Sequence, residues 1–415
     1  MDHIAYEHSL LNNGLQVISS YHPAAPVTTV TCHVAAGSRY ERPDEFGYAH
    51  FAEHLTFDGT KRFPSRLAVG EEIDRLGALA NAYTGKESIW WHVQAPSSLA
   101  EDSVALLAEM LCHSKFDVEA ISHERQVISQ EISRAEDDPM WILYKQMLAQ
   151  VFGAHPLGHW PLGDPTVVAS ATPERVVAYY QRRVGPKNSV ITVVGSLNHE
   201  QVVALVGKYF GQWNDLSDER QMVVPLETTR PGRNHLAFTA QRTCFSLTYL
   251  LPSSTERERS IGEVLVAWLA QGRSSMMWKK LRTTLGLTYD PNGSYTPFKE
   301  IGAIQLSGSS TQPTACLTAL TDMMINPAPL LTAEEFQHTV QRLINKTWQQ
   351  VYGTQLGEAN FLGSEALLAD ELVTPDDWRS ALAAVTYEET IATMRQFLKP
   401  AQGYLTVVGP EAVIE

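Results

Sequence analysis

Residues 189–195 read Ser-Val-Ile-Thr-Val-Val-Gly, an unbroken β-branched run that ends in glycine. Such a run predicts a strand buried on both faces and followed by a turn. Residues 403–409, Gly-Tyr-Leu-Thr-Val-Val-Gly, repeat this pattern 214 residues later, and Pro186 and Pro400 keep the same offset. The repeated strand indicates that the chain contains one fold twice.

A second pair of β-rich segments occurs in the same order, Val27–Val34 in the first half and Phe245–Leu251 in the second. Strands and helices are mixed without strict βαβ alternation, which predicts an α+β fold made of two homologous mixed-sheet domains. We place the domains at residues 1–215 and 235–415, joined by a polar, turn-rich linker at 216–234. Helical periodicity predicts helices at 100–115, 121–135, 200–210, 257–285 and 333–351.

The composition excludes some classes of partner. With 44% hydrophobic and 19% charged residues the chain is typical of globular proteins, and its net charge of −14 argues against nucleic acid and anionic membranes as partners. The N-terminus has no signal-peptide pattern, no segment approaches the roughly 18 apolar residues of a membrane span, and the four cysteines form no Cys-x-x-Cys motif. We therefore expect a cytoplasmic protein with reduced thiols.

The strongest local signal is Gly47-Tyr-Ala-His-Phe-Ala-Glu-His54. On a helix, His50, Glu53 and His54 fall on one face, so the two imidazoles can bind one ion with the carboxylate beside it. Zinc accepts neutral imidazole and lowers the pKa of bound water, which a nearby carboxylate that is not a ligand can deprotonate. The alternative is a solvated helix with incidental histidines.

A catalytic zinc normally has three protein ligands, so one more must come from elsewhere in the chain. Glu124 and Glu131 lie seven residues apart in a helical pattern, which places both carboxylates on one face. Glu131 can then be the ligand while Glu124 supports a ligand histidine. From spacing alone, two solvent-facing charges on a surface helix explain the pattern equally well.

Several motifs together resemble the pitrilysin/insulinase family of zinc peptidases, which carry the inverted His-x-x-Glu-His motif. The 77-residue step from His54 to Glu131 matches the family's step from the second histidine to the glutamate ligand. The resemblance covers nearly the whole chain. It includes Gly37-Ser38, Glu41, Phe57-Asp-Gly59-Thr60, Asn81-Ala82 with Glu87, Glu124–Ile132, His155-Pro-Leu-Gly158 and, in the second half, Gly272-Arg-Ser-Ser275 and Leu281-Arg282.

The resemblance implies a role for each site residue. His50, His54 and Glu131 would be the zinc ligands, Glu53 the general base, and Glu124 the carboxylate that supports a ligand. Asn81 and Ala82 would lie on a strand edge where the substrate backbone pairs. Arg282 and Tyr289 match the family's Arg and Tyr in type and spacing, and would hold the substrate carbonyl and stabilise the developing oxyanion.

The second half lacks the metal motif. The 217-residue strand offset carries His50, Glu53 and His54 onto Ala267, Ala270 and Gln271, so we expect one Zn²⁺ per chain.

The resemblance implies a zinc metalloendopeptidase that hydrolyses small or unfolded polypeptides. Long family members hold four domains in one chain and close like a clam shell, whereas this chain has residues for two. It is therefore similar to the short bacterial and mitochondrial-processing types, which build the chamber from two chains. We expect a homodimer in which Arg282 and Tyr289 act on the partner's zinc site, with a heterodimer left open. The alternative function is an accessory subunit that presents peptide without cleaving it.

Overall fold

The computed structural model describes residues 6–213, 226, 229–253, 255–325, 331–368 and 372–410. The chain forms two compact units, each composed of three separate stretches. Unit 1 contains Met1–Ile132, His159–Met222 and Trp348–Pro375, and unit 2 contains Ser133–Gly158, Val223–Thr347 and Asp376–Glu415. Of the predicted linker, residues 216–225, 227 and 228 lie outside the described part.

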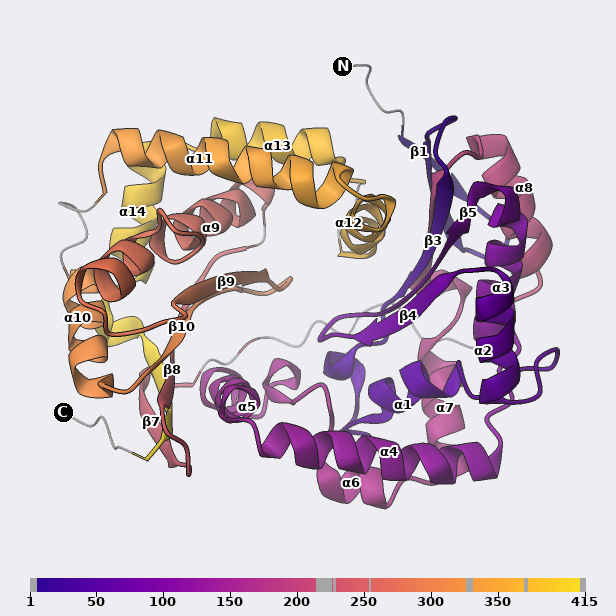
Figure 1. Ribbon diagram of the computed structural model, residues 1–415, viewed down its shortest axis with the longest axis horizontal. Coiled ribbons are helices and arrows are strands. Elements are labelled where there is room, and N and C mark those ends of the chain that lie inside the picture. The colour runs from indigo at the N-terminus through magenta and orange to yellow at the C-terminus, as the bar shows by residue number, and fades with distance from the viewer. Residues whose placement is uncertain are drawn as a thin grey trace. The chain divides into compact units, whose positions relative to one another are not determined.

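Unit 1 is built on a six-stranded sheet (Figure 1). In spatial order its strands are β1 (Tyr6–Leu10), β2 (Gln16–Tyr21), β6 (Ser189–Gly195), β3 (Val27–Val34), β5 (Ile89–Pro96) and β4 (Leu79–Thr84). Strands β2 and β6 are parallel, and the other neighbours are antiparallel. Strand β6 is buried along its whole length, as its sequence predicted, whereas β4 lies at the edge of the sheet.

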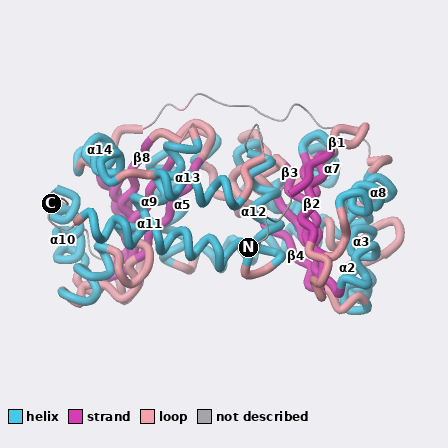
Figure 2. Tube along the Cα trace, turned by 90° about the horizontal axis from the view of Figure 1, so that it is seen from above, coloured by secondary structure: helices cyan, strands magenta, loops and turns pink. Residues whose placement is uncertain are grey.

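Helices cover both faces of this sheet. Helix α12 (Gln355–Leu368) packs on β3 and β6, while α3 (Ala100–Cys112) and α8 (His199–Phe210) cover the opposite face (Figure 1). Figure 2, turned by 90°, also shows α12 beside β3. The helices that carry the site, or pack on those that do, are α1 (Tyr48–Leu55), α2 (Arg66–Arg75), α4 (Val118–Glu136), α6 (Pro165–Ala169) and α7 (Pro173–Arg183).

Unit 2 is built on a five-stranded sheet. Its order is β7 (Gly232–Ala237), β11 (Tyr404–Gly409), β8 (Thr243–Leu251), β10 (Gly302–Ser310) and β9 (Asn292–Pro297). Helix α5 (Pro139–Phe152) packs on β8 and β11, and α9 (Glu256–Leu269) packs on β9 and β10. The remaining helices are α10 (Pro313–Ile325), α11 (Ala333–Thr347), α13 (Pro375–Ala384) and α14 (Tyr387–Phe397).

The two sheets share one topology. The order β2-β6-β3-β5-β4 in unit 1 corresponds to β7-β11-β8-β10-β9 in unit 2, and in both the first pair is parallel and the rest antiparallel. The unit 2 edge strand β9 begins at Asn292, 213 residues after β4 begins at Leu79. The predicted duplication and the α+β class are confirmed.

One feature of the duplication was not predicted, namely that each half of the sequence gives a helix to the other half's sheet. Helices α5 and α12 are each 14 residues long and begin 216 residues apart, at Pro139 and Gln355. In unit 1, α12 contributes Ala359 and Leu362 to the core formed with Val190 and Val194. The compact units therefore are not continuous in sequence, unlike the predicted stretches 1–215 and 235–415.

One helix prediction was wrong in extent. The pattern at 257–285 is divided between α9 and a π-helical segment, Trp278–Thr284. Gly272 has a φ of 80°, which favours glycine and is incompatible with a continuous helix. The buried Arg342 guanidinium donates to the carbonyl oxygen of Ala267 at 2.8 Å and to that of Gln271, so side-chain donors satisfy the end of α9.

Two further expectations concern cysteines and membrane spans. Cys32, Cys112, Cys244 and Cys316 are all free thiols in the structure. None of the helices among the described residues has the length and apolar composition needed to span a bilayer.

Candidate metal centre

Helix α1 is held at its N-terminus by a carboxylate from the preceding loop. Gly47, with a φ of 109°, makes the sharp entry into the helix that a side chain would hinder. The buried Glu41 accepts hydrogen bonds from the backbone N–H groups of Gly47 at 3.0 Å and Ala49 at 2.7 Å. These are donors that a helix N-terminus leaves unpaired, and a negative charge there also favours the helix dipole. The turn that carries His50 is therefore fixed from outside the helix.

Three donor atoms from two helices converge in unit 1. The Nε2 atoms of His50 and His54 on α1 are 3.1 Å apart. From α4, an oxygen of Glu131 lies 3.4 Å from the Nε2 atom of His50 and 3.7 Å from that of His54. The structure thus brings together the three side chains that the sequence predicted as ligands.

The spacing of these atoms fits a zinc ion. Zinc binds imidazole nitrogen and carboxylate oxygen at about 2.0–2.2 Å, and tetrahedral angles then separate neighbouring ligand atoms by about 3.3 Å. The three observed separations of 3.1, 3.4 and 3.7 Å bracket this value. Two imidazoles and a carboxylate also form a known donor set of catalytic zinc sites, which leave one position open. The residues present therefore fit zinc.

A buried network supports one of the two histidines. Glu124 is fully buried, and one of its oxygens lies 2.6 Å from the Nδ1 atom of His54. Its other oxygen accepts a hydrogen bond from Arg66 at 2.7 Å, and Arg66 also donates to Asp58 at 2.5 Å. Glu124 thereby orients the ring of His54 so that its Nε2 atom faces the site. The Nδ1 atom of His50, by contrast, is buried and has no hydrogen-bond partner within the described part of the chain.

Burial and charge set different protonation preferences for the two imidazoles. Burial lowers the pKa of His50 to about 3, so this ring is neutral and its Nε2 lone pair is available to a metal. Burial also opposes protonation of His54, but the carboxylates of Glu124, Glu131 and Glu53 outweigh it and raise its pKa. For Glu124 burial opposes ionisation, yet the hydrogen bond with His54 and the charges of His54 and Arg66 lower its pKa. The surplus of negative charge around His54 favours a cation.

Glu53 lies beside the ligands but is held by a different element. One of its oxygens accepts a hydrogen bond of 2.5 Å from the hydroxyl of Thr84, at the end of β4. Burial raises the pKa of Glu53, and the hydrogen bonds from Thr84 act in the opposite direction. A carboxylate with a raised pKa beside a metal site is suited to act as a general base.

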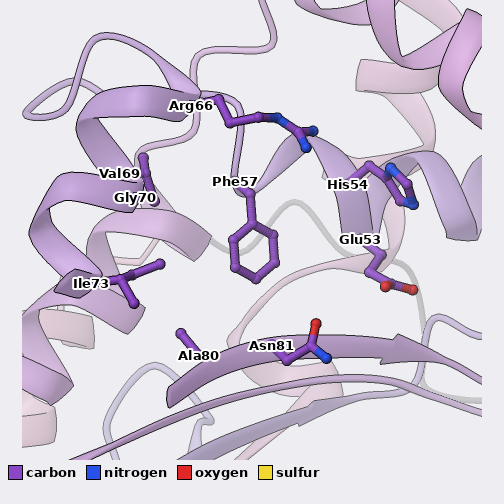
Figure 3. Close-up of a pocket in the computed structure, with 9 residues that line it drawn as sticks. All are labelled: Glu53, His54, Phe57, Arg66, Val69, Gly70, Ile73, Ala80 and Asn81. Carbon is purple, nitrogen blue, oxygen red and sulfur yellow. The ribbon is translucent and has the colours of Figure 1, made fainter. Parts of the chain in front are cut away.

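A pocket of about 330 Å³ opens next to Glu53 and His54 (Figure 3). Figure 3 shows Glu53 extending from α1 toward β4, where Asn81 lies on the opposite side of the pocket. The deeper lining is apolar and comes from α2, β4 and the loop after α1. The lining residues are Glu53, His54, Phe57, Arg66, Val69, Gly70, Ile73, Ala80 and Asn81.

Strand β4 offers free backbone groups at the sheet edge. The backbone N–H of Gly85 bonds to Ser88, which fixes the alternation of the hairpin, so the backbone groups of Ala80, Ala82 and Thr84 point away from β5. The N–H of Ala82 is bound by the side-chain oxygen of its neighbour Asn81 at 2.9 Å. Asn81 and Ala82 therefore lie on an open edge, where the sequence placed them.

Arg282 and Tyr289 lie together within unit 2. The guanidinium of Arg282 stacks on the ring of Tyr289, 4.1 Å from its centroid, and donates a hydrogen bond to the Tyr289 carbonyl. Its other face stacks on Trp278 at 4.2 Å. Tyr289 is 71% exposed, so its hydroxyl is accessible.

Three residues near the centre were missed in the sequence. Thr84 shares a strand face with Ala82, because side chains alternate along a strand, and could have been found from that period. Arg66 and Asp58 carry no such signal, because their contacts with Glu124 and with each other join segments far apart in the sequence.

Comparisons with known proteins bear on the whole chain. Residues 16–165 match the model of the insulinase family, peptidase family M16, and residues 170–343 match the model of the M16 inactive domain. A zinc protease of Mycobacterium leprae is 31% identical over 301 residues, which cover 71% of this chain and 67% of that protein. A probable mitochondrial-processing peptidase subunit beta of Schizosaccharomyces pombe is 34% identical over 219 residues, covering 53% and 48%.

Solved structures share the fold at lower identity. A protease from Helicobacter pylori superposes with a TM-score of 0.90 at 19% identity, covering 98% of this chain and all of that one. His50, Glu53, His54 and Glu131 all fall within the stretch that matches the first family model, and Arg282 falls within the stretch that matches the inactive domain. The metal motif, the duplicated fold and these matches together show that the chain belongs to the insulinase family of peptidases, family M16.

Proposed function

We propose that the protein is a zinc endopeptidase that hydrolyses small or unfolded polypeptides, with Glu53 as general base. The observation that carries this proposal is the convergence of His50, His54 and Glu131 at separations of 3.1–3.7 Å, with Glu53 beside them. When bound, zinc would supply Lewis-acid chemistry, polarising a carbonyl and lowering the pKa of water. The buried carboxylate of Glu53 would take the proton of the attacking water and deliver it to the leaving amine.

The edge of β4 is suited to bind the substrate backbone. A peptide can add to it as a further strand, using the outward groups of Ala80 and Ala82, while the next outward position, Thr84, holds Glu53. Pairing along this edge would present a peptide bond to the base. Because only an extended chain can pair in this way, the geometry favours unfolded segments as substrates.

The pocket beside Glu53 would select an apolar side chain of the bound peptide. Gly70 on α2 lines it, and a side chain there would meet open space, with nothing within 4 Å of its Cβ position. Gly70→Leu should therefore lower kcat/KM for peptides with a large apolar residue at this subsite by about 10–100-fold, since burying such a side chain contributes about 1.5–3 kcal/mol. Peptides with alanine there should be affected much less.

A digest of a peptide library with mass-spectrometric readout measures this change. Gly207→Leu on α8 is the matched control, because its Cβ position also has nothing within 4 Å and it does not line the pocket. An unchanged cleavage profile for Gly70→Leu would exclude the pocket as a specificity site.

We further propose that the working enzyme is a homodimer in which Arg282 and Tyr289 of one chain act on substrate at the partner's zinc site. Mixing Glu53→Gln with Arg282→Ala, each nearly inactive alone, should restore activity. The mixed dimer keeps one intact site, so an equal mixture should reach about a quarter of the wild-type rate, because half of its dimers are mixed. No recovery after subunit exchange, verified by tagged pull-down, would contradict action across the dimer.

The overall proposal is tested by digestion of one polypeptide in a folded and an unfolded form. The expected result is cleavage of the unfolded form, loss of cleavage on treatment with a chelator, and recovery with one equivalent of zinc. An accessory subunit would bind the unfolded chain without cutting it, with or without zinc. That outcome would replace the peptidase proposal by the alternative.

A further inference from the structure

Two carboxylates lie within reach of the same metal position. The ligand atoms of His50, Glu53 and His54 all lie within 4.8 Å of one another, and Glu131 contacts both imidazoles at 3.4 and 3.7 Å. A zinc ion with all four side chains as ligands would have a closed site, as in structural zinc sites, whereas catalytic sites keep one position open. Some feature of the chain must therefore keep one carboxylate away from the metal.

The two carboxylates are anchored very differently. Within the described part of the chain, Glu131 makes polar contacts only with the two imidazoles, and its side chain is 43% exposed. It is free to turn toward a cation. Glu53 is buried and bound at 2.5 Å by the hydroxyl of Thr84, and the backbone N–H of Thr84 also bonds to it. Hydrogen bonds to an ionised carboxylate are about twice as strong as neutral ones.

The anchor belongs to a rigid element rather than to the metal helix. Thr84 ends β4, whose position is fixed by pairing with β5 from Leu79 to Thr84. The contact thus joins the substrate edge to Glu53 and directs one of its oxygens toward the strand.

We propose that Thr84 is a positioning residue that prevents Glu53 from becoming a fourth zinc ligand, and so keeps both the base and an open metal position. This inference rests on the proposed function in one respect, that the cation is zinc. Thr84→Val removes the hydroxyl and retains the β-branched shape. The freed carboxylate of Glu53 should then join the ligands.

The direction of the effect on metal release distinguishes this role from ordinary support. Loss of a contact that merely orients the site weakens metal binding, typically by about 10–100-fold. The proposal predicts the opposite, because Thr84→Val would add a ligand: zinc release to a chromophoric chelator should slow, by about tenfold or more on the same scale. The Co²⁺-loaded variant should also show a visible spectrum different from that of the wild type, and kcat should fall while KM changes little.

Two further variants complete the test. Thr84→Ser retains the hydroxyl and should restore the wild-type release rate and spectrum. In a Glu53→Ala background, Thr84→Val should have no further effect on release, because the carboxylate that would bind is gone. Release at or above the wild-type rate in Thr84→Val, or an equal change in the Glu53→Ala background, would overturn the proposal. Since metal release is measured without hydrolysis, a protein that binds zinc but cleaves nothing would still decide the role of Thr84.

Discussion

Glu53→Gln should remove most peptide hydrolysis while zinc stays bound. Glutamine keeps the shape of the side chain and can still accept the hydrogen bond from Thr84, but it cannot take a proton from water. Loss of a general base typically costs about 10²–10⁴-fold, so we expect a fall of that size in kcat with at least one zinc per chain retained. The measurements are steady-state kinetics on an unfolded polypeptide and zinc content by mass spectrometry.

The control for this substitution is Glu71→Gln, an exposed glutamate on α2 that does not line the pocket. It removes the same charge from the same unit and should leave kcat unchanged. If Glu53→Gln lost its zinc instead, Glu53 would be a ligand and the assignment of the base would be wrong.

Glu131→Ala should remove the metal itself. It leaves two imidazoles to hold zinc, and we expect affinity to fall by more than the roughly 10–100-fold typical for loss of a supporting residue. Hydrolysis should fall with it and recover in part at high added zinc. Because the Glu131 side chain is 43% exposed, the variant should fold, and thermal unfolding of the metal-free proteins should be similar.

The matched control is Glu119→Ala, an exposed glutamate on the same helix α4. It should bind zinc as tightly as the wild type. Full zinc retention in Glu131→Ala would contradict the ligand assignment, and together with zinc loss in Glu53→Gln it would exchange the roles of the two carboxylates.

The central features of the fold could be predicted because they depend on local patterns. The β-branched run at 189–195 forms a fully buried strand, and its copy near the C-terminus forms β11 at the corresponding place. The exchange of α5 and α12 could not be predicted. Each helix buries an apolar face, but the pattern does not state against which of two similar sheets.

The same distinction applies to the site. The one-turn spacing of His50 and His54 is a property of a single helix, and the resemblance to a known family supplied Glu131 and Glu124. Contacts between elements remained hidden: Thr84 on Glu53, and Arg66 on Asp58 and Glu124. These depend on how β4 and α2 pack beside α1, which no local pattern in the sequence encodes.

The account depends on one cation held by side chains from α1 and α4. Crystals of the purified protein, measured above and below the zinc absorption edge, test this directly. We predict one anomalous peak per chain, within about 2.0–2.2 Å of the Nε2 atoms of His50 and His54 and of a Glu131 oxygen. The absence of a peak there, or a peak that leaves Glu131 turned away, would contradict the account.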